Sequence, residues 1–110
     1  MPQVKREIDL RRHQRILVPE GRKIRAESRR GAPRLEGIVS VIGLGGIFVR
    51  TRASEPRGTI LHLRLTDQLV TFESDCIVRS IAENGMGLEF TAIAPPDEQK
   101  LRFLLRQMKS

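Results

Sequence analysis

The sequence contains no tryptophan or tyrosine and only four phenylalanines among its 110 residues. Proteins that bind single-stranded nucleic acid usually stack bases on exposed aromatic side chains, so this scarcity argues against that class. The apolar runs are only a few residues long, whereas a transmembrane helix needs about 20 apolar residues. The first residues are polar and lack the apolar segment of a signal peptide. We therefore expect no membrane insertion and a cytoplasmic location.

Cysteine is almost absent as well. The single Cys76 cannot form an internal disulfide, and it lies in an alternating apolar run where a small buried side chain is expected. With one cysteine and two histidines that do not cluster, the sequence predicts no metal site. It also lacks a phosphate-binding loop with a Lys-Ser/Thr pair, a Ser-His-Asp or Cys-His pattern, and a carboxylate pair in an apolar setting. We therefore predict that the protein is not an enzyme and needs no cofactor.

Positive charge, by contrast, is in excess. The chain has 20 lysines and arginines against 13 acidic residues, a formal net charge of +7 and a pI near 11.0. Such a balance favours an anionic partner. The basic residues are concentrated over 11–34 and 100–109. A nucleic-acid partner would rest on this charge alone, so we do not favour it.

Short apolar runs separated by turn residues predict an all-β fold closed by one helix. Strands are expected over 15–18, 23–28, 35–42, 47–51, 59–65, 69–81 and 86–91. The long strand over 69–81 is expected to bend near Ser74 and Asp75. Asn84-Gly85 predicts a hairpin, since these residues tolerate left-handed backbone angles. His62 alternates with leucines, which predicts a surface histidine rather than a ligand.

A C-terminal helix is predicted over 96–108. Pro95-Pro96 suits its start, and acidic residues follow at the positive end of the helix dipole. Residues spaced i, i+3, i+4 and i+7 form one apolar stripe: Leu101, Leu104, Leu105 and Met108. We expect this stripe to pack on the protein's own sheet, with a dimer-forming helix as the alternative. The pattern describes a small β-barrel or sandwich with a capping helix, as a monomer or weak homodimer.

Two stretches suggest a binding site. Arg11-Arg12-His13-Gln14-Arg15 is a dense basic segment before the first strand, and Val41-Ile42-Gly43-Leu44-Gly45-Gly46 is a glycine turn between two strands. Arginine binds phosphate oxygens, or the O6/N7 edge of guanine, with two parallel hydrogen bonds. A glycine turn lets a ligand approach backbone N–H groups closely. If the two stretches meet in space, they suit a compact anionic ligand that contains guanine.

On these residues the sequence resembles the PilZ domain family. The resemblance rests on Arg11-x-x-x-Arg15, on Gly45-Gly46-Ile47-Phe48-Val49, and on the hairpin that leads to Gly87-Leu88-Glu89-Phe90 and the terminal helix. It covers about residues 11–108. It implies a six-stranded antiparallel β-barrel that binds the bacterial second messenger cyclic di-GMP. Residues 1–10 are polar and lack a sustained period, so we expect a flexible tail there before a domain over 11–110. In the receptor that the resemblance implies, this N-terminal segment folds over the barrel when the ligand binds.

The family's second motif, Asp/Asn-x-Ser-x-x-Gly, is incomplete in this sequence. Alignment through the paired glycines puts Val41 at the acidic or amide position and Gly43 at the serine position, and keeps only Gly46. Loss of both hydrogen bonds would cost roughly 2–4.5 kcal/mol, or about 1.5 to 3 decades of affinity. Backbone donors in the glycine turn are expected to offset part of that loss.

A shifted alignment keeps Ser40 and Gly43 but puts Ile38 at the acidic position. It also loses the match of the paired glycines. In the preferred alignment, strict alternation along the strand would put Ser40 on the opposite face from Val41. On that basis we expect that Ser40 does not replace the missing serine.

Two functions remain open at this point. In the first, the domain is a cyclic di-GMP receptor, and its predicted ligand-binding residues are Arg11, Arg12, Arg15, Gly43, Gly46 and Arg79. In the second, it is a degenerate adaptor that binds no nucleotide and acts through protein contacts in motility, pilus or envelope regulation. The arginine pair favours the first, and the side chains lost at Val41 and Gly43 favour the second. In both, we expect an effector protein as partner, because a chain of this length has no second effector domain.

Overall fold

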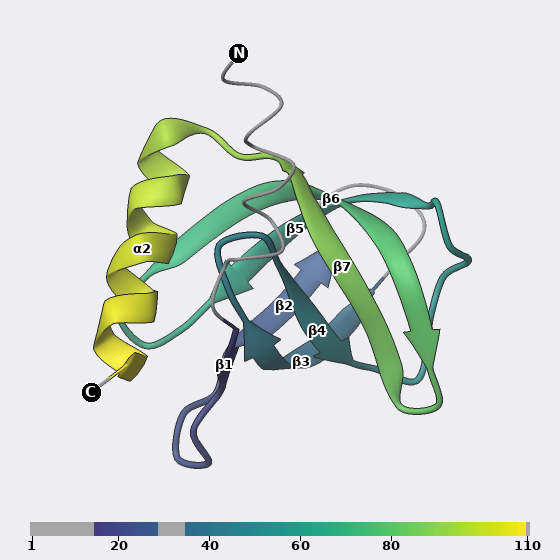
Figure 1. The fold of residues 1–110 in the computed structure, drawn as a ribbon, viewed down its shortest axis with the longest axis horizontal. Helices are drawn as coiled ribbons and strands as arrows, with labels where there is room; N and C mark the ends of the chain where they lie inside the picture. The colour runs from purple at the N-terminus through teal and green to yellow at the C-terminus, as the bar shows by residue number, and fades with distance from the viewer. Residues whose placement is uncertain (1–14, 29–34, 110) are drawn as a thin grey trace.

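The computed structural model describes residues 15–28 and 35–109. Its strands are β1 (Ile16–Leu17), β2 (Arg25–Ser28), β3 (Glu36–Ile42), β4 (Gly46–Arg50), β5 (Ile60–Thr66), β6 (Thr71–Ala82) and β7 (Gly85–Ala92), and helix α2 (Pro95–Lys109) follows them (Figure 1). The predicted strands and the C-terminal helix are confirmed. The expected tail over 1–10 lies outside the described residues. No helix in the described part of the chain is long and apolar enough to span a membrane.

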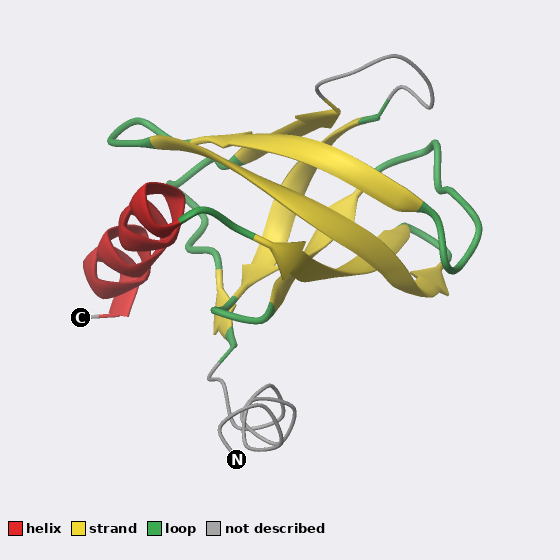
Figure 2. Ribbon diagram, turned by 90° about the horizontal axis from the view of Figure 1, so that it is seen from above, coloured by secondary structure: helices red, strands yellow, loops and turns green. Residues whose placement is uncertain are grey.

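Six of the strands close into an antiparallel barrel. Neighbouring strands follow the order β3-β2-β5-β6-β7-β4, and pairing of β4 with β3 joins the two ends. β1 is an additional strand that pairs with the end of β3, on the same edge as β2 and opposite β4. The predicted six-stranded barrel is therefore confirmed, with one strand added to it. Figure 2 shows the crossing strands of the barrel with α2 packed outside them.

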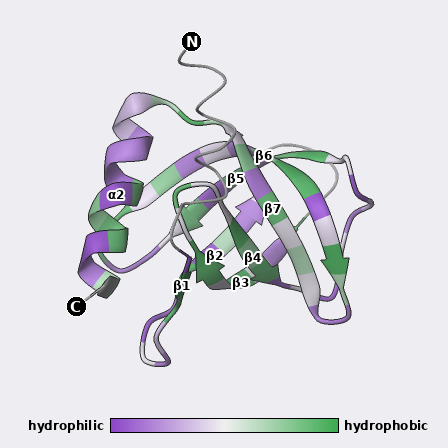
Figure 3. Cartoon of the chain, viewed as in Figure 1, coloured by the Kyte–Doolittle hydropathy of each residue, from purple (hydrophilic) through white to green (hydrophobic). Residues whose placement is uncertain are grey.

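Alternation along the strands fills the barrel interior. Figure 3 shows apolar and polar residues interleaved along β6 and β7. The inward side chains form one core that includes Ile24, Val39, Val49, Leu63, Phe72 and Met86. From α2, Leu101 and Leu104 join this core and Leu105 packs partly buried against it. The prediction that the helical stripe packs on the protein's own sheet is confirmed.

β3 departs from strict alternation at Ser40. Its register with β4 shifts between Val39 and Val41, which makes Ser40 an extra residue on this strand. Val39 and Ile42 are both buried, whereas Ser40 and Val41 between them are both partly exposed. This β-bulge places Ser40 and Val41 together on the outer face of the barrel. The prediction that they lie on opposite faces is wrong, because a bulge inserts a residue without continuing the alternation.

β6 and β7 form the predicted hairpin, but the reason for a glycine at position 85 differs from the predicted one. Ala82 pairs with Gly85, so the turn lies at residues 83 and 84. Among the described residues only Gly58 has a positive φ, 91°. The expected left-handed angles are therefore absent at this turn. A Cβ on Gly85 would lie 2.0 Å from the carbonyl oxygen of Val49, so close packing of β7 on β4 is what requires the glycine.

The expected bend in β6 coincides with an irregularity of its pairing. The register with β7 shifts between Asp75 and Cys76. Ser74, just before the shift, is buried, and its hydroxyl donates to the carbonyl oxygens of Asp75 (2.9 Å) and Ala92 (3.2 Å). Cys76 is fully buried, as its apolar surroundings predict.

Candidate functional site

β1 brings Arg15, the last residue of the basic segment, to the glycine turn. It pairs antiparallel with the end of β3, with Leu17 opposite Val41. Continuing this register by two residues places Arg15 beside Gly43. Arg15 is exposed and immediately precedes β1. Of the basic segment, the structure describes only Arg15, and this residue lies at the glycine turn.

The glycine turn over 43–46 closes the hairpin between β3 and β4. The N–H of Gly43 donates to the carbonyl oxygen of Gly46 at 2.9 Å. Gly46 in turn pairs with Glu89 of β7. A Cβ on Gly46 would lie 2.1 Å from the carbonyl oxygen of Leu88. Packing of β4 on β7 thus requires a glycine at this position, whatever the domain binds.

Arg79 reaches the same region from β6. Its Nε donates to Oε1 of Glu89 at 2.5 Å, and its side chain is 61% exposed. Glu89 pairs with Gly46 on one side and with Ile77 on the other. Sequence reasoning did not select Glu89 as a site residue. The only sequence signal for it is that it alternates with the apolar Leu88 and Phe90, which places it on the outer face.

These contacts align the described site residues in a row across the barrel, in which Gly43 is buried and the others are at least partly exposed. We call this set the glycine-turn band: Arg15, Gly43, Gly46, Glu89 and Arg79. From Arg15 to Glu89 the band crosses three strand-to-strand steps of about 4.8 Å each, or about 14 Å in all. It holds two guanidinium groups and one carboxylate. The other predicted site residues, Arg11 and Arg12, lie outside the described residues.

An apolar row runs beside the glycine-turn band. Cross-strand pairing connects Leu17, Val41, Phe48 and Gly87 on β1, β3, β4 and β7. Leu17 is 76% exposed, a high value for a leucine. The ring of Phe48 lies near Gly87, where its Cδ2 would be 4.0 Å from an added Cβ. Next to its charged groups, the outer face therefore offers an apolar surface.

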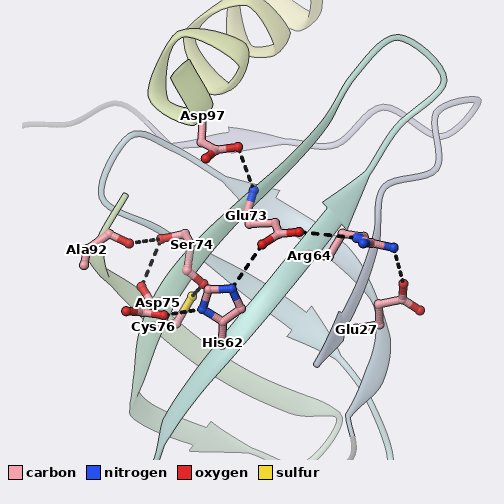
Figure 4. A network of polar contacts seen from close by, with 9 residues as sticks. All are labelled: Glu27, His62, Arg64, Glu73, Ser74, Asp75, Cys76, Ala92 and Asp97. Atoms are coloured by element: carbon pink, nitrogen blue, oxygen red, sulfur yellow. Dashed lines mark hydrogen bonds and ion pairs between the residues drawn. The ribbon is translucent and has the colours of Figure 1, made fainter. Parts of the chain in front are cut away.

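A separate polar network occupies the outer face of β5 and β6 (Figure 4). Nδ1 of His62 hydrogen-bonds to Oδ1 of Asp75, and Nε2 lies 3.1 Å from Oε1 of Glu73. The hydrogen bond to Asp75 and then that to Glu73 raise the pKa of His62 against the opposing effect of burial. The prediction of a surface histidine is confirmed. Among the described residues, no group of three His, Cys, Asp or Glu side chains could hold a metal ion.

The same network extends to β2 and α2. Nε of Arg64 lies 3.6 Å from Oε2 of Glu73, and its Nη1 lies 3.9 Å from Oε2 of Glu27. The backbone N–H of Glu73 donates to Oδ1 of Asp97 in the first turn of α2, at 3.1 Å. The network therefore connects three strands and the helix, which fits a structural role.

Arg22 and Asp67 anchor the loop that follows β1. Nε and Nη2 of Arg22 donate to the two carboxylate oxygens of Asp67, each at 3.2 Å. The Asp67 side chain is 1% exposed and also accepts the N–H of Leu69 at 3.0 Å. Burial acts to raise the pKa of Asp67, but the hydrogen bonds from Arg22 and Leu69 hold it below its usual value. This pair fixes the β1–β2 loop to the β5–β6 loop.

Comparison with known proteins adds the family. The family model described as PilZ domain matches residues 9–107. None of the curated proteins matches the chain. The PilZ domain of YcgR from Escherichia coli, solved with c-di-GMP, has a TM-score of 0.73 at 17% identity, covering 89% of this chain and 90% of that one.

Two longer proteins contain a similar fold. The Bacillus subtilis inhibitor of motility, MotI/DgrA, gives a TM-score of 0.64 at 22% identity over 86% of this chain. MrkH, a c-di-GMP-dependent transcription regulatory factor, gives 0.69 at 14% identity over 87% of this chain. This chain covers 49% of each of them. The structural likeness shows the fold, and the family model matches nearly the whole chain, so this chain belongs to the PilZ domain family.

Proposed function

We propose that this domain is a receptor for cyclic di-GMP that relays the signal to a partner protein and catalyses no reaction. One observation carries the proposal: the pairing of β1 with β3 sets Arg15 beside the glycine turn over 43–46. Arg11 and Arg12 precede Arg15 in the sequence and are proposed to supply further guanidinium groups to the same ligand. A solved structure of the same fold, the YcgR PilZ domain, contains c-di-GMP, which supports this choice of ligand.

The chemistry of the glycine-turn band suits such a ligand. Cyclic di-GMP carries two phosphates and two guanines, and an arginine can bind either group with two parallel hydrogen bonds. The exposed Arg15 is placed for this role, and Arg79 has N–H groups beyond the one that it donates to Glu89. The apolar row that contains Leu17 offers a surface for a base. Because Val41 and Gly43 lack polar side chains, we expect weaker binding than a complete motif would give.

The test is isothermal titration calorimetry of cyclic di-GMP into the wild type and two arginine variants. Heat is the practical signal because the chain has no tryptophan. Arg15→Ala removes a charge-assisted hydrogen bond worth about 1.5–3 kcal/mol, so it should weaken binding by about 10- to 100-fold. Arg50→Ala is the matched control. Arg50 is exposed at the far end of β4, four residues or about 13 Å from Gly46.

Equal losses in the two variants would show that binding depends on total charge rather than on this site. No heat at high micromolar ligand, with circular dichroism showing a folded protein, would contradict the receptor function. The adaptor function would then take its place. It is favoured by one observation, the exposure of Leu17 beside Val41 where the family motif has a polar residue. In that case Leu17→Ser should reduce capture of the effector protein while leaving the melting temperature within about 3 °C of the wild type.

A further inference from the structure

Glu89 stands out because it is a carboxylate within the glycine-turn band, a surface proposed to bind an anion. The side chain is 25% exposed, and it lies on the outer face because Leu88 and Phe90 on either side of it are in the core. A carboxylate there opposes phosphate binding unless it has a favourable interaction of its own. Guanine supplies one, since its N1–H and N2–H2 groups are adjacent donors and a carboxylate is purely an acceptor.

We propose that Glu89 replaces the missing acidic residue of the second motif and accepts the N1–H and N2–H2 hydrogens of a bound guanine. The inference rests on the proposed receptor function and names the residue that recognises the guanine base. The side chain of Val41, at the motif's acidic position, cannot accept a hydrogen bond. Glu89 is the one carboxylate of the glycine-turn band, and it takes the place of the motif residue.

The position of Glu89 supports the exchange. β4 lies between β3 and β7, with Val41 paired to Phe48 from one side and Glu89 paired to Gly46 from the other. Val41 and Glu89 thus both lie on the outer face, on the two strands that flank β4. Glu89 is one strand-to-strand step, about 4.8 Å, from the glycine that the motif retains. A base held over the turn can be reached from β7 as readily as from β3.

The existing contacts of Glu89 leave it able to accept two hydrogens. Nε of Arg79 donates to Oε1. Within the described part of the chain, Oε2 has no hydrogen-bond partner. A carboxylate has about four acceptor positions, so Oε1 can accept a second hydrogen while Arg79 holds it. The guanidinium of Arg79 also offsets the negative charge of Glu89, which reduces its repulsion of the ligand's phosphates.

The first experiment measures base selectivity. Wild type, Glu89→Gln and the control Glu98→Gln are titrated with cyclic di-GMP and with cyclic di-AMP, whose adenine has an unprotonated N1 and no N2 amine. Glu98 is a suitable control because it pairs with Arg102 within the helix. We expect Glu89→Gln to bind cyclic di-GMP about 10- to 100-fold more weakly than the wild type. Its cyclic di-AMP affinity should not fall, and Glu98→Gln should match the wild type with both ligands.

A second experiment needs no variant, so it holds even if Glu89→Gln folds poorly. The wild type is titrated with cyclic di-IMP, in which hypoxanthine lacks the N2 amine. The loss of one charge-assisted hydrogen bond should weaken binding at least about 10-fold relative to cyclic di-GMP. Equal affinity for the two ligands, or a Glu89→Gln variant that binds cyclic di-GMP as tightly as the wild type, would overturn the role of Glu89 and leave the receptor function standing. A wild type that does not bind cyclic di-GMP at all would overturn both.

Discussion

Replacing Gly46 by alanine separates a structural requirement for this glycine from a ligand-binding one. The added Cβ would lie 2.1 Å from the carbonyl oxygen of Leu88 and 3.2 Å from the Cα of Glu89. Ordinary van der Waals contact begins at 3.4 Å, so the first distance is about 1.3 Å too short. Both neighbours are backbone atoms, so no side-chain rotation relieves the clash. β4 and β7 must move apart, and their pairing is part of what closes the barrel.

The cost follows from two contributions. Overpacking a rigid site costs about 1–3 kcal/mol, and each ladder hydrogen bond that breaks adds about 0.5–1.5 kcal/mol. With one bond lost, Gly46→Ala should lower the free energy of unfolding by about 2–4 kcal/mol. For a domain of this size that corresponds to a fall in melting temperature of about 10–20 °C.

The assay is urea and thermal unfolding followed by far-ultraviolet circular dichroism, because the chain has neither tryptophan nor tyrosine. Gly21→Ala is the matched control, since a Cβ there would meet no atom within 4 Å and its φ is not positive. Both substitutions reduce the entropy of the unfolded chain alike, so the difference between them isolates the clash. A Gly46→Ala variant that melts within about 2 °C of Gly21→Ala would refute the steric reasoning.

Three further predictions concern titratable groups. Arg22→Met should destabilise the protein by about 2–4 kcal/mol at pH 7, since it leaves the buried carboxylate of Asp67 unpaired. The pKa of Asp67 is lowered in the fold, so the stability that the pair contributes is present above the unfolded pKa of about 3.9 and is lost as pH falls through the folded value. Urea titrations should therefore show a smaller loss of unfolding free energy in the Arg22→Met variant at pH 3 than at pH 7. His62→Gln should lower the free energy of unfolding by less than about 1 kcal/mol near pH 6 and by almost nothing at pH 9. The pKa of His62 is raised in the fold, so the stability that its ion pairs contribute is complete below about pH 6.5 and is lost as pH rises through the folded value. An equal fall in melting temperature at both pH values would contradict this. Cys76 should resist a thiol reagent at pH 8 until urea unfolds the protein, since burial raises its pKa to about 12, and labelling of the native protein within minutes would argue against that burial.

Part of the candidate site could be predicted from the sequence, and one of its residues could not. The sequence predicts Arg15, Gly43, Gly46 and Arg79 as site residues. The fold brings these four together, with Arg15 and Arg79 exposed and Gly43 buried. Their ligand-binding roles stay predictions. Glu89 was missed because no local pattern distinguishes it from any other polar residue on the outer face of a strand.

The sequence by itself determined the elements of this protein. Alternating runs placed the strands, and the stripe at Leu101, Leu104 and Leu105 placed α2, because such patterns depend only on which side of a local element faces the core. The family resemblance supplied the closed barrel, which local pattern had left open to a sandwich. The glycines of the binding motif could likewise be recognised from the sequence alone.

Only the tertiary structure decided how strand positions far apart in the sequence are matched. The bulge that puts Ser40 beside Val41, the clash that demands Gly46, and the placement of Glu89 next to that glycine all depend on register between strands. Register is set by the packing of the whole barrel, and a shift of one residue changes which face a side chain occupies. Register does not follow from the local sequence of any one strand. The face on which Ser40 lies and the position of Glu89 in the glycine-turn band therefore follow only from the folded structure.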